Sequence, residues 1–271
     1  MHASFSFSRL AALVRKQWME NARFYLLATL AIIGLNALLF TFWISTSNQY
    51  EEQTTYVFFY VGLLLAGCIF ASSAFSMLGK KEQGMYWLGL PASHLEKLVC
   101  TIFYTTIIFT VVYTAAFFLV RSAAYMVIQS IVAHHRDHQW IPVRLKIENH
   151  FLDNFIYFAY AYFAVQAVYL MGSVYFARAS FVVTTIIGAV IIFSFIYLMT
   201  RVSNHFAPDQ LMWDGLTMRT INMSDPGGRA FEHRVYHVSD WLGQTVLFLL
   251  KFGWAPVFWT IAYFRLKEKE I

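Results

Sequence analysis

The sequence has little charge for its length. Asp, Glu, Lys and Arg together make up 13% of its 271 residues, whereas soluble domains carry roughly 25%. Hydrophobic residues make up 59%, and the mean hydropathy is +0.53. This composition excludes an ordinary soluble domain and predicts a membrane protein.

The sequence also has few cysteines and lacks an ATP-binding loop. Its two cysteines, Cys68 and Cys100, lie within or at the edge of long apolar runs. Such positions predict buried, small apolar side chains and give no sign of a disulfide framework in the polar segments. No G-x-x-x-x-G-K-[ST] pattern is present to hold ATP phosphates. Any ATP that drives this protein must therefore be hydrolysed by a separate chain.

Six apolar runs are long enough to cross a bilayer as helices, which takes about 20 residues. They cover residues 24–43, 54–78, 98–120, 155–177, 181–200 and 241–264. Continuous runs of this kind differ from the alternating segments of about ten residues that build membrane β-barrels. The predicted fold class is therefore an all-α polytopic membrane protein with six transmembrane helices. The sixth run contains Lys251 and Pro256 and fits the pattern least well.

The predicted organisation has six parts along the chain. They are a leader helix (1–23), the first three spans (24–120), an outer segment (121–154), the fourth and fifth spans (155–200), a second outer segment (201–240), and the sixth span with a tail (241–271). The side that carries both termini has 11 Lys and Arg in 52 residues, against 8 in 83 on the other side. The positive-inside rule then places both termini in the cytoplasm and the chain in the inner (plasma) membrane. The basic balance reflects contact with the lipid bilayer and gives no reason to expect a nucleic-acid partner.

The leader has one apolar stripe. Phe7, Leu10, Val14 and Trp18 recur at helical spacing, with Ala11 between them. Arg9 and Lys16 point to the opposite face. This pattern favours an amphipathic helix that lies along the membrane surface, with a solvated leader as the alternative.

The polar stretch at 80–97 lies between the second and third spans. Ser93 and Glu96 match the S-x-x-E capping box, so a helix is predicted to begin at about Ser93, directly after Pro91. One interpretation is a well-capped start to the third span. The other is a docking surface, because Met85, Tyr86 and Trp87 add large apolar contacts to the neighbouring charges.

A local motif in this stretch resembles a known family. Leu90, Pro91, Ala92, Ser93, Leu95, Glu96 and Lys97 form the pattern LPAS-x-LEK, preceded by Glu82 and Gly84. With the amphipathic leader and the six-span layout, it resembles the membrane subunits of type 2 ATP-binding-cassette (ABC) transporters. In this chain Gly84 lies closer to Pro91 than in the commoner members.

The resemblance implies a function and a set of partners. In that family the leader is an elbow helix, here Phe7 to Asn21, and the turn is a coupling helix, here Lys80 to Lys97, that contacts a separate ATPase. The chain would be an exporter subunit that dimerises with itself or a similar subunit, is not itself an enzyme, and leaves ATP and Mg to the ATPase. The implied coupling residues are Glu82, Gly84, Met85, Tyr86, Trp87, Pro91, Ser93, Glu96 and Lys97. The substrate and its pathway are not indicated.

Two rival functions remain open. His134 and His138 share a helix face in HHRDH and form a weak metal candidate, although the zinc-protease pattern H-E-x-x-H needs Glu in second position. They would serve a membrane-embedded enzyme that uses outer-face His and Asp groups. A non-transporting scaffold would instead tolerate charge reversal at Glu82 and Glu96. Lys251 is either a functional intramembrane charge or a side chain that extends to the interface from a helix at the membrane surface.

Overall fold

The structure is a computed structural model that describes residues 5–46, 52–134, 149–176, 178–206, 211–214, 218–223, 232–237, 241, 244–245 and 248–269. Within these ranges, five helical stretches are long and apolar enough to cross a membrane. They are Phe7–Thr46, Gln53–Ser73, His94–Ile131, Phe155–Tyr175 and Ser180–Leu198. The sequence-based prediction of a helical, membrane-embedded protein is confirmed at this level.

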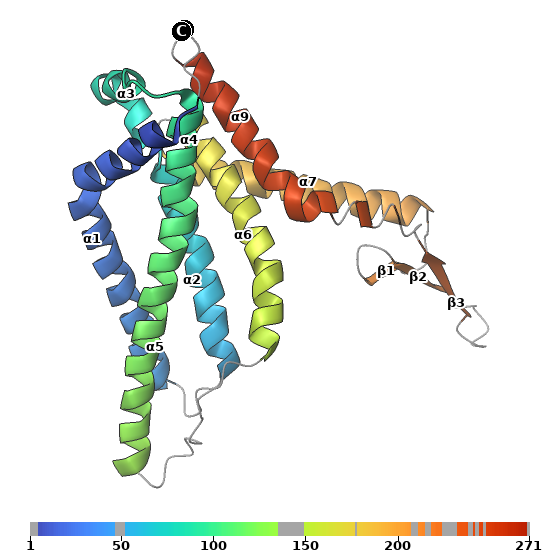
Figure 1. Ribbon diagram of the computed structural model, residues 1–271. Helices are drawn as coiled ribbons and strands as arrows, with labels where there is room; N and C mark the ends of the chain where they lie inside the picture. The colour runs from blue at the N-terminus through green and yellow to red at the C-terminus, as the bar shows by residue number, and fades with distance from the viewer. Residues whose placement is uncertain are drawn as a thin grey trace.

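Four helices form the bundle: α1 (Phe7–Thr46), α2 (Glu52–Ser73), α5 (Phe109–His134) and α6 (Asn149–Tyr175). In Figure 1 they run side by side for most of their length. Their shared core is largely aromatic, and its buried members include Phe40, Trp43, Phe59, Phe117 and Tyr162. The rings of Phe59 and Phe117, for example, meet edge to face at 5.1 Å. Offset and edge-on ring contacts of this kind add to the packing energy of the interior.

Glycines allow close contact between neighbouring helices. A Cβ at Gly67 of α2 would collide with Gln166 and Tyr162 of α6, and one at Gly172 of α6 would collide with Thr184. The backbones of α2 and α6 therefore approach each other closely at Gly67. By contrast, a Cβ at Gly188 would meet no atom within 4 Å.

We predict that Gly172→Val lowers the free energy of unfolding by about 1–3 kcal/mol, because the β-branched Thr184 leaves no space for the added atoms. The matched substitution Gly188→Val should leave stability nearly unchanged. Thermal unfolding of the two variants in the same detergent distinguishes them. Equal melting temperatures would show that α6 and α7 do not pack as described.

The third membrane helix is longer than the sequence predicts. The chain is helical without a break from α4 (His94–Ile102) through a π-helical turn, η2 (Phe103–Ile108), and on to the end of α5 at His134. The outer segment was expected to begin at 121; the helix continues past this position, and the boundary of the outer segment stays a prediction. Arg121 does not end the helix because its side chain is buried, with the guanidinium 5.4 Å from the ring of Tyr56 and 5.9 Å from that of Phe118. Cation–π contacts of this kind lower the cost of burying the charge.

The last of the five long apolar stretches lies in α7 (Ser180–Phe206), which leaves the bundle sideways in Figure 1. Most of its apolar side chains are exposed, among them Ile191, Phe193 and Ile196. After it come three antiparallel strands in the order β1 (Leu211–Asp214), β2 (Met218–Met223) and β3 (Glu232–His237). The all-α expectation therefore fails for the second outer segment, where strand pairing satisfies backbone hydrogen-bonding groups that no helix satisfies.

The predicted sixth span is only partly matched. A π-helical turn, η3 (Leu249–Gly253), leads into α9 (Trp254–Glu268). This helix packs along α6 and ends in the charged residues Arg265, Lys267 and Glu268. It is not among the five stretches that qualify by length and hydropathy within the described residues. A span over 241–264 therefore stays a prediction.

One end of the bundle gathers segments that are distant in sequence. The first part of α1, dark blue in Figure 1, runs across this end before the helix descends beside α5. The start of α4, the end of α9 and the short helices η1 (Ser76–Gly79) and α3 (Lys81–Leu88) lie at the same end. At about 1.5 Å per residue, the 40 residues of α1 are roughly twice as long as a bilayer is thick.

Candidate functional site

The carboxylate of Glu96 joins the start of α4 to the start of α1. The predicted capping box is present: the Glu96 amide donates to Ser93 Oγ at 3.2 Å, and the Ser93 amide donates to Glu96 Oε2 at 2.8 Å. The other carboxylate oxygen accepts from the Ser6 amide at 2.7 Å and pairs with Arg9 Nη2 at 3.1 Å. Glu96 is fully buried. A buried carboxylate is tolerated only when it is paired and hydrogen-bonded in this way.

Lys97, the next residue, is also buried, and its ammonium lies 5.3 Å from the ring centre of Trp87 on α3. The Trp87 ring in turn meets Phe75 edge to face at 5.5 Å. Around them is an apolar cluster formed by α3, α4, α6 and α9, whose buried members include Leu98, Leu170, Val174, Ala262 and Leu266. The inner side of α3 is therefore packed in one cluster with three other helices of the protein.

The outer side of α3 is exposed. Met85 and Tyr86 are 60% and 59% accessible, and Glu82 is exposed beside them. Tyr86 donates its hydroxyl hydrogen to Glu20 Oε1 at 3.2 Å, and the Lys16 ammonium lies 4.7 Å from the centre of its ring. Surface contacts like these contribute little to stability. They orient the Tyr86 ring against α1 and leave Met85 accessible.

The nine residues implied as coupling residues thus fall into two groups. Glu82, Met85, Tyr86 and Pro91 are exposed, whereas Gly84, Trp87, Glu96 and Lys97 are buried and Ser93 is a half-buried helix cap. The side chains of Trp87, Glu96 and Lys97 contact other parts of the protein, and the coupling role of the nine residues stays a prediction. Gly84 is not required by close packing, since a Cβ there would meet Leu78 Cα at an ordinary 3.6 Å.

The leader stripe packs partly against the protein. Leu10 and Val14 are half-buried, and the Val14 carbonyl accepts a hydrogen bond from Tyr104 Oη at 2.7 Å. Phe7 and Trp18 remain exposed, at 80% and 48%. The stripe therefore contacts the third membrane helix and leaves two aromatic side chains outside.

Several residues of this site were not identified from the sequence. Ser6 and Arg9 were not linked to Glu96, and Lys16 and Glu20 were not linked to Tyr86. No local pattern connects partners that lie 90 and 66 positions apart. The one available signal was the complementary charge of Arg9 and Glu96.

The structure describes Lys251 but not the side chains of the histidine pair proposed as a metal site. The metal candidate rests on His134 and His138, whose side chains lie outside the described part of the chain. Lys251 is half-buried in η3, and its ammonium lies 5.2 Å and 5.8 Å from the ring centres of Tyr157 and Tyr160. Two aromatic faces on α6 thus stabilise this charge in place.

Among the described residues, no group of three or more His, Cys, Asp or Glu side chains that could hold a metal ion is present. The short helix α3 has an exposed outer side and an inner side that packs against the protein. Such an element suits recognition of a partner or transmission of force. Comparisons with protein-family models, with curated proteins and with solved structures found no match for this chain.

Proposed function

We propose that this protein is the transmembrane subunit of an ABC-type exporter, powered by a separate ATPase that docks on α3. The single observation that carries the proposal is the two-sided character of α3. Its outer side chains, Met85 and Tyr86, are exposed to contact with another protein, whereas its inner Trp87 is buried in a cluster with three other helices. Large apolar side chains of this type are frequent anchors in protein interfaces.

The contacts around α3 also allow a displacement of this helix to reach the membrane helices. A displacement of α3 acts on α4 through Trp87 and Lys97, and α4 continues as one helix to His134. Through Glu96, the same end of α4 is joined to Arg9 and Ser6 on the leader. ATP-driven closure of the ATPases would thereby shift the first and third membrane helices together. ATP and Mg belong to the partner, because this sequence has no phosphate-binding loop.

A second membrane subunit, identical or similar, completes the proposal. The basic residues near α3 and both termini favour a cytoplasmic location for this end. The exposed apolar face of α7 is available for a neighbouring subunit or for lipid. The substrate path would then lie between two membrane subunits, and the substrate class is left open.

Purification of the tagged protein from its native cell in nanodiscs, with mass spectrometry of stoichiometric partners, tests this function. We expect a co-purifying ATPase that Met85→Arg reduces about tenfold or more, since an interface anchor of this kind is worth at least about 1.4 kcal/mol. The matched control is Met126→Arg on α5, where the side chain is also exposed, at 69%. A chain that purifies without any ATPase would refute the exporter proposal.

Charge reversal separates an exporter from a scaffold. Of the two acidic residues considered, only Glu82 is exposed and gives a clean test, because Glu96 is buried and its reversal would disturb the fold. We expect Glu82→Lys to weaken ATPase stimulation while leaving expression and thermal stability unchanged. A scaffold would retain all its partners in this variant.

A further inference from the structure

Two cavities lie side by side between the first part of α1 and the helices α2, α4 and η2. The larger, which we call the polar chamber, has a volume of about 360 Å³. Its polar lining consists of amides and hydroxyls: Gln17, Asn21, Ser73, Ser76, Gln83, Thr101, Tyr104 and Thr105. No Lys, Arg, Asp or Glu side chain lines it among the described residues.

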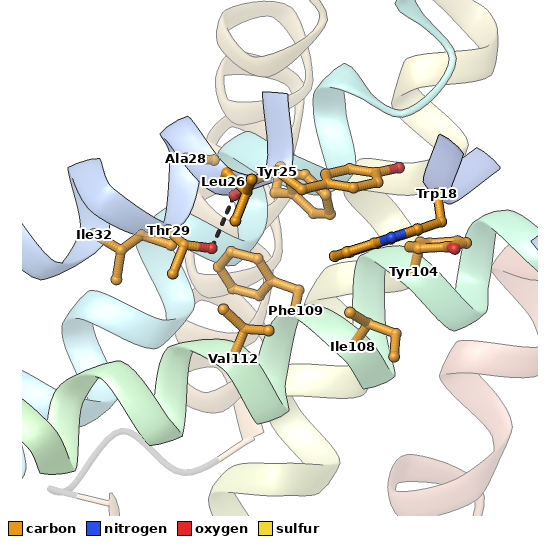
Figure 2. A pocket seen from close by; sticks show the side chains of 11 residues that line it. Trp18, Tyr25, Leu26, Ala28, Thr29, Ile32, Tyr104, Ile108, Phe109 and Val112 are labelled. Carbon is orange, nitrogen blue, oxygen red and sulfur yellow. Dashed lines mark hydrogen bonds between the residues drawn. The ribbon is translucent and has the colours of Figure 1, made fainter. Parts of the chain in front are cut away.

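The smaller cavity, which we call the apolar slot, has a volume of about 80 Å³ and lies between α1 and α5. Figure 2 shows the rings of Trp18, Tyr25 and Tyr104 close together on one side of it, with Ile108 and Val112 below. The rings of Tyr25 and Tyr104 are stacked at 5.4 Å, and those of Trp18 and Tyr25 at 5.9 Å.

The chamber and the slot are adjacent and share part of their lining. Tyr25, Phe70 and Tyr104 line both of them. The π-helical turn η2 supplies Tyr104 and Thr105 to the chamber and Ile108 to the slot. Single π-turns inside longer helices are frequent at functional sites, because they change the direction of side chains locally.

The side chains that line the chamber and the slot determine which class of ligand the two cavities can bind. A polar cavity directly beside an apolar one suits a single amphiphile. A phosphate or carboxylate in the chamber would lack a counter-charge, and burying an unpaired charge is costly. The side-chain amides can instead both donate to and accept from the hydroxyls of an uncharged headgroup. The hydroxyls of Ser73, Thr101, Tyr104 and Thr105 donate to backbone carbonyls and can still accept a hydrogen bond from such a headgroup.

We propose that the chamber and slot together bind one membrane lipid with an uncharged, hydroxyl-bearing headgroup. The headgroup occupies the chamber near Asn21, and the adjoining part of an acyl chain enters the slot beside Ile108. Such a lipid would fill the space between α1 and α4 close to the Glu96 contacts. The site is independent of the proposed ATPase and is tested without it.

Photo-labelling in nanodiscs tests the proposal. The probe is a diacylglycerol with a diazirine in one acyl chain, and the comparison probe is phosphatidylglycerol with the same chain. We expect the neutral probe to label α1 and η2, and the anionic probe to label them about tenfold less. We expect Ile108→Trp, which fills the slot, to lower labelling by the neutral probe about fivefold. Ile107→Trp is the matched control, since this neighbour is 50% exposed and does not line either cavity.

A second variant tests the headgroup directly. Asn21→Lys places a cation in the chamber and should raise labelling by phosphatidylglycerol severalfold relative to diacylglycerol. A purely structural role of Asn21 would not reverse the preference. Equal labelling of Ile108→Trp and Ile107→Trp, or equal labelling by both probes in the unaltered protein, would overturn the proposal.

Discussion

Replacing Glu96 with alanine is expected to lower the free energy of unfolding by about 3 kcal/mol. The change removes the acceptor for the buried amides of Ser93 and Ser6 and the partner of Arg9. Loss of the capping box alone costs about 1 kcal/mol. Because the Arg9 side chain is 38% exposed, water can solvate it in the variant, which keeps the cost below that of a fully buried pair.

Two further variants separate the contributions. Glu96→Gln keeps an acceptor oxygen for the Ser93 amide, but it loses the charge and replaces the oxygen that accepts from Ser6 and Arg9 with an NH2 group, so we expect a cost of about 1–2 kcal/mol. Glu20→Ala removes an exposed carboxylate that contacts Lys16 and Tyr86, and we expect a change within about 0.5 kcal/mol. The measurement is thermal unfolding of all three variants in one detergent. Similar melting temperatures for Glu96→Ala and Glu20→Ala would contradict the description of Glu96 as a buried connection.

Replacing Trp87 with alanine is expected to cost about 3–5 kcal/mol and to loosen α3. The indole is 8% exposed, and its removal leaves a cavity beside Phe75 and takes away the aromatic face over Lys97. Limited digestion with trypsin measures the second effect, since Lys80 is exposed immediately before α3. We expect faster cleavage there in the variant.

Two controls accompany this prediction. Trp87→Phe retains an aromatic face and should lose less than half of the stability that Trp87→Ala loses. Trp254→Ala removes the same side chain at a position that is 47% exposed, and should leave cleavage at Lys80 unchanged. Rapid cleavage in all three variants would mean that α3 is not held by Trp87.

Local patterns predicted the local structure well. The spacing of Ser93 and Glu96 predicted a capped helix start, and both hydrogen bonds of the capping box are present. Long apolar runs predicted five helices of membrane-spanning length correctly. Both inferences depend only on residues within a few turns of one another.

Long-range contacts could not be predicted in this way. Nothing in the sequence near Glu96 indicates that Ser6 and Arg9 fold onto it, because the chain must first cross and return through the bundle. For the same reason no sequence pattern indicated that Lys97, an implied coupling residue, is buried beside the ring of Trp87. Arg121 was expected in an outer segment, and its burial against Tyr56 and Phe118 depends on packing between helices.

The most direct test of the proposed function is site-specific photo-crosslinking from α3 in the native cell. A photoreactive amino acid at position 86, in place of the exposed Tyr86, should form a covalent adduct with an ABC ATPase. The same amino acid in place of Tyr197, which is 62% exposed on α7, should not form this adduct. An adduct with the ATPase at position 86 alone would support α3 as its docking element. If position 86 forms no adduct with any ATPase in cells that export normally, the proposed function is wrong.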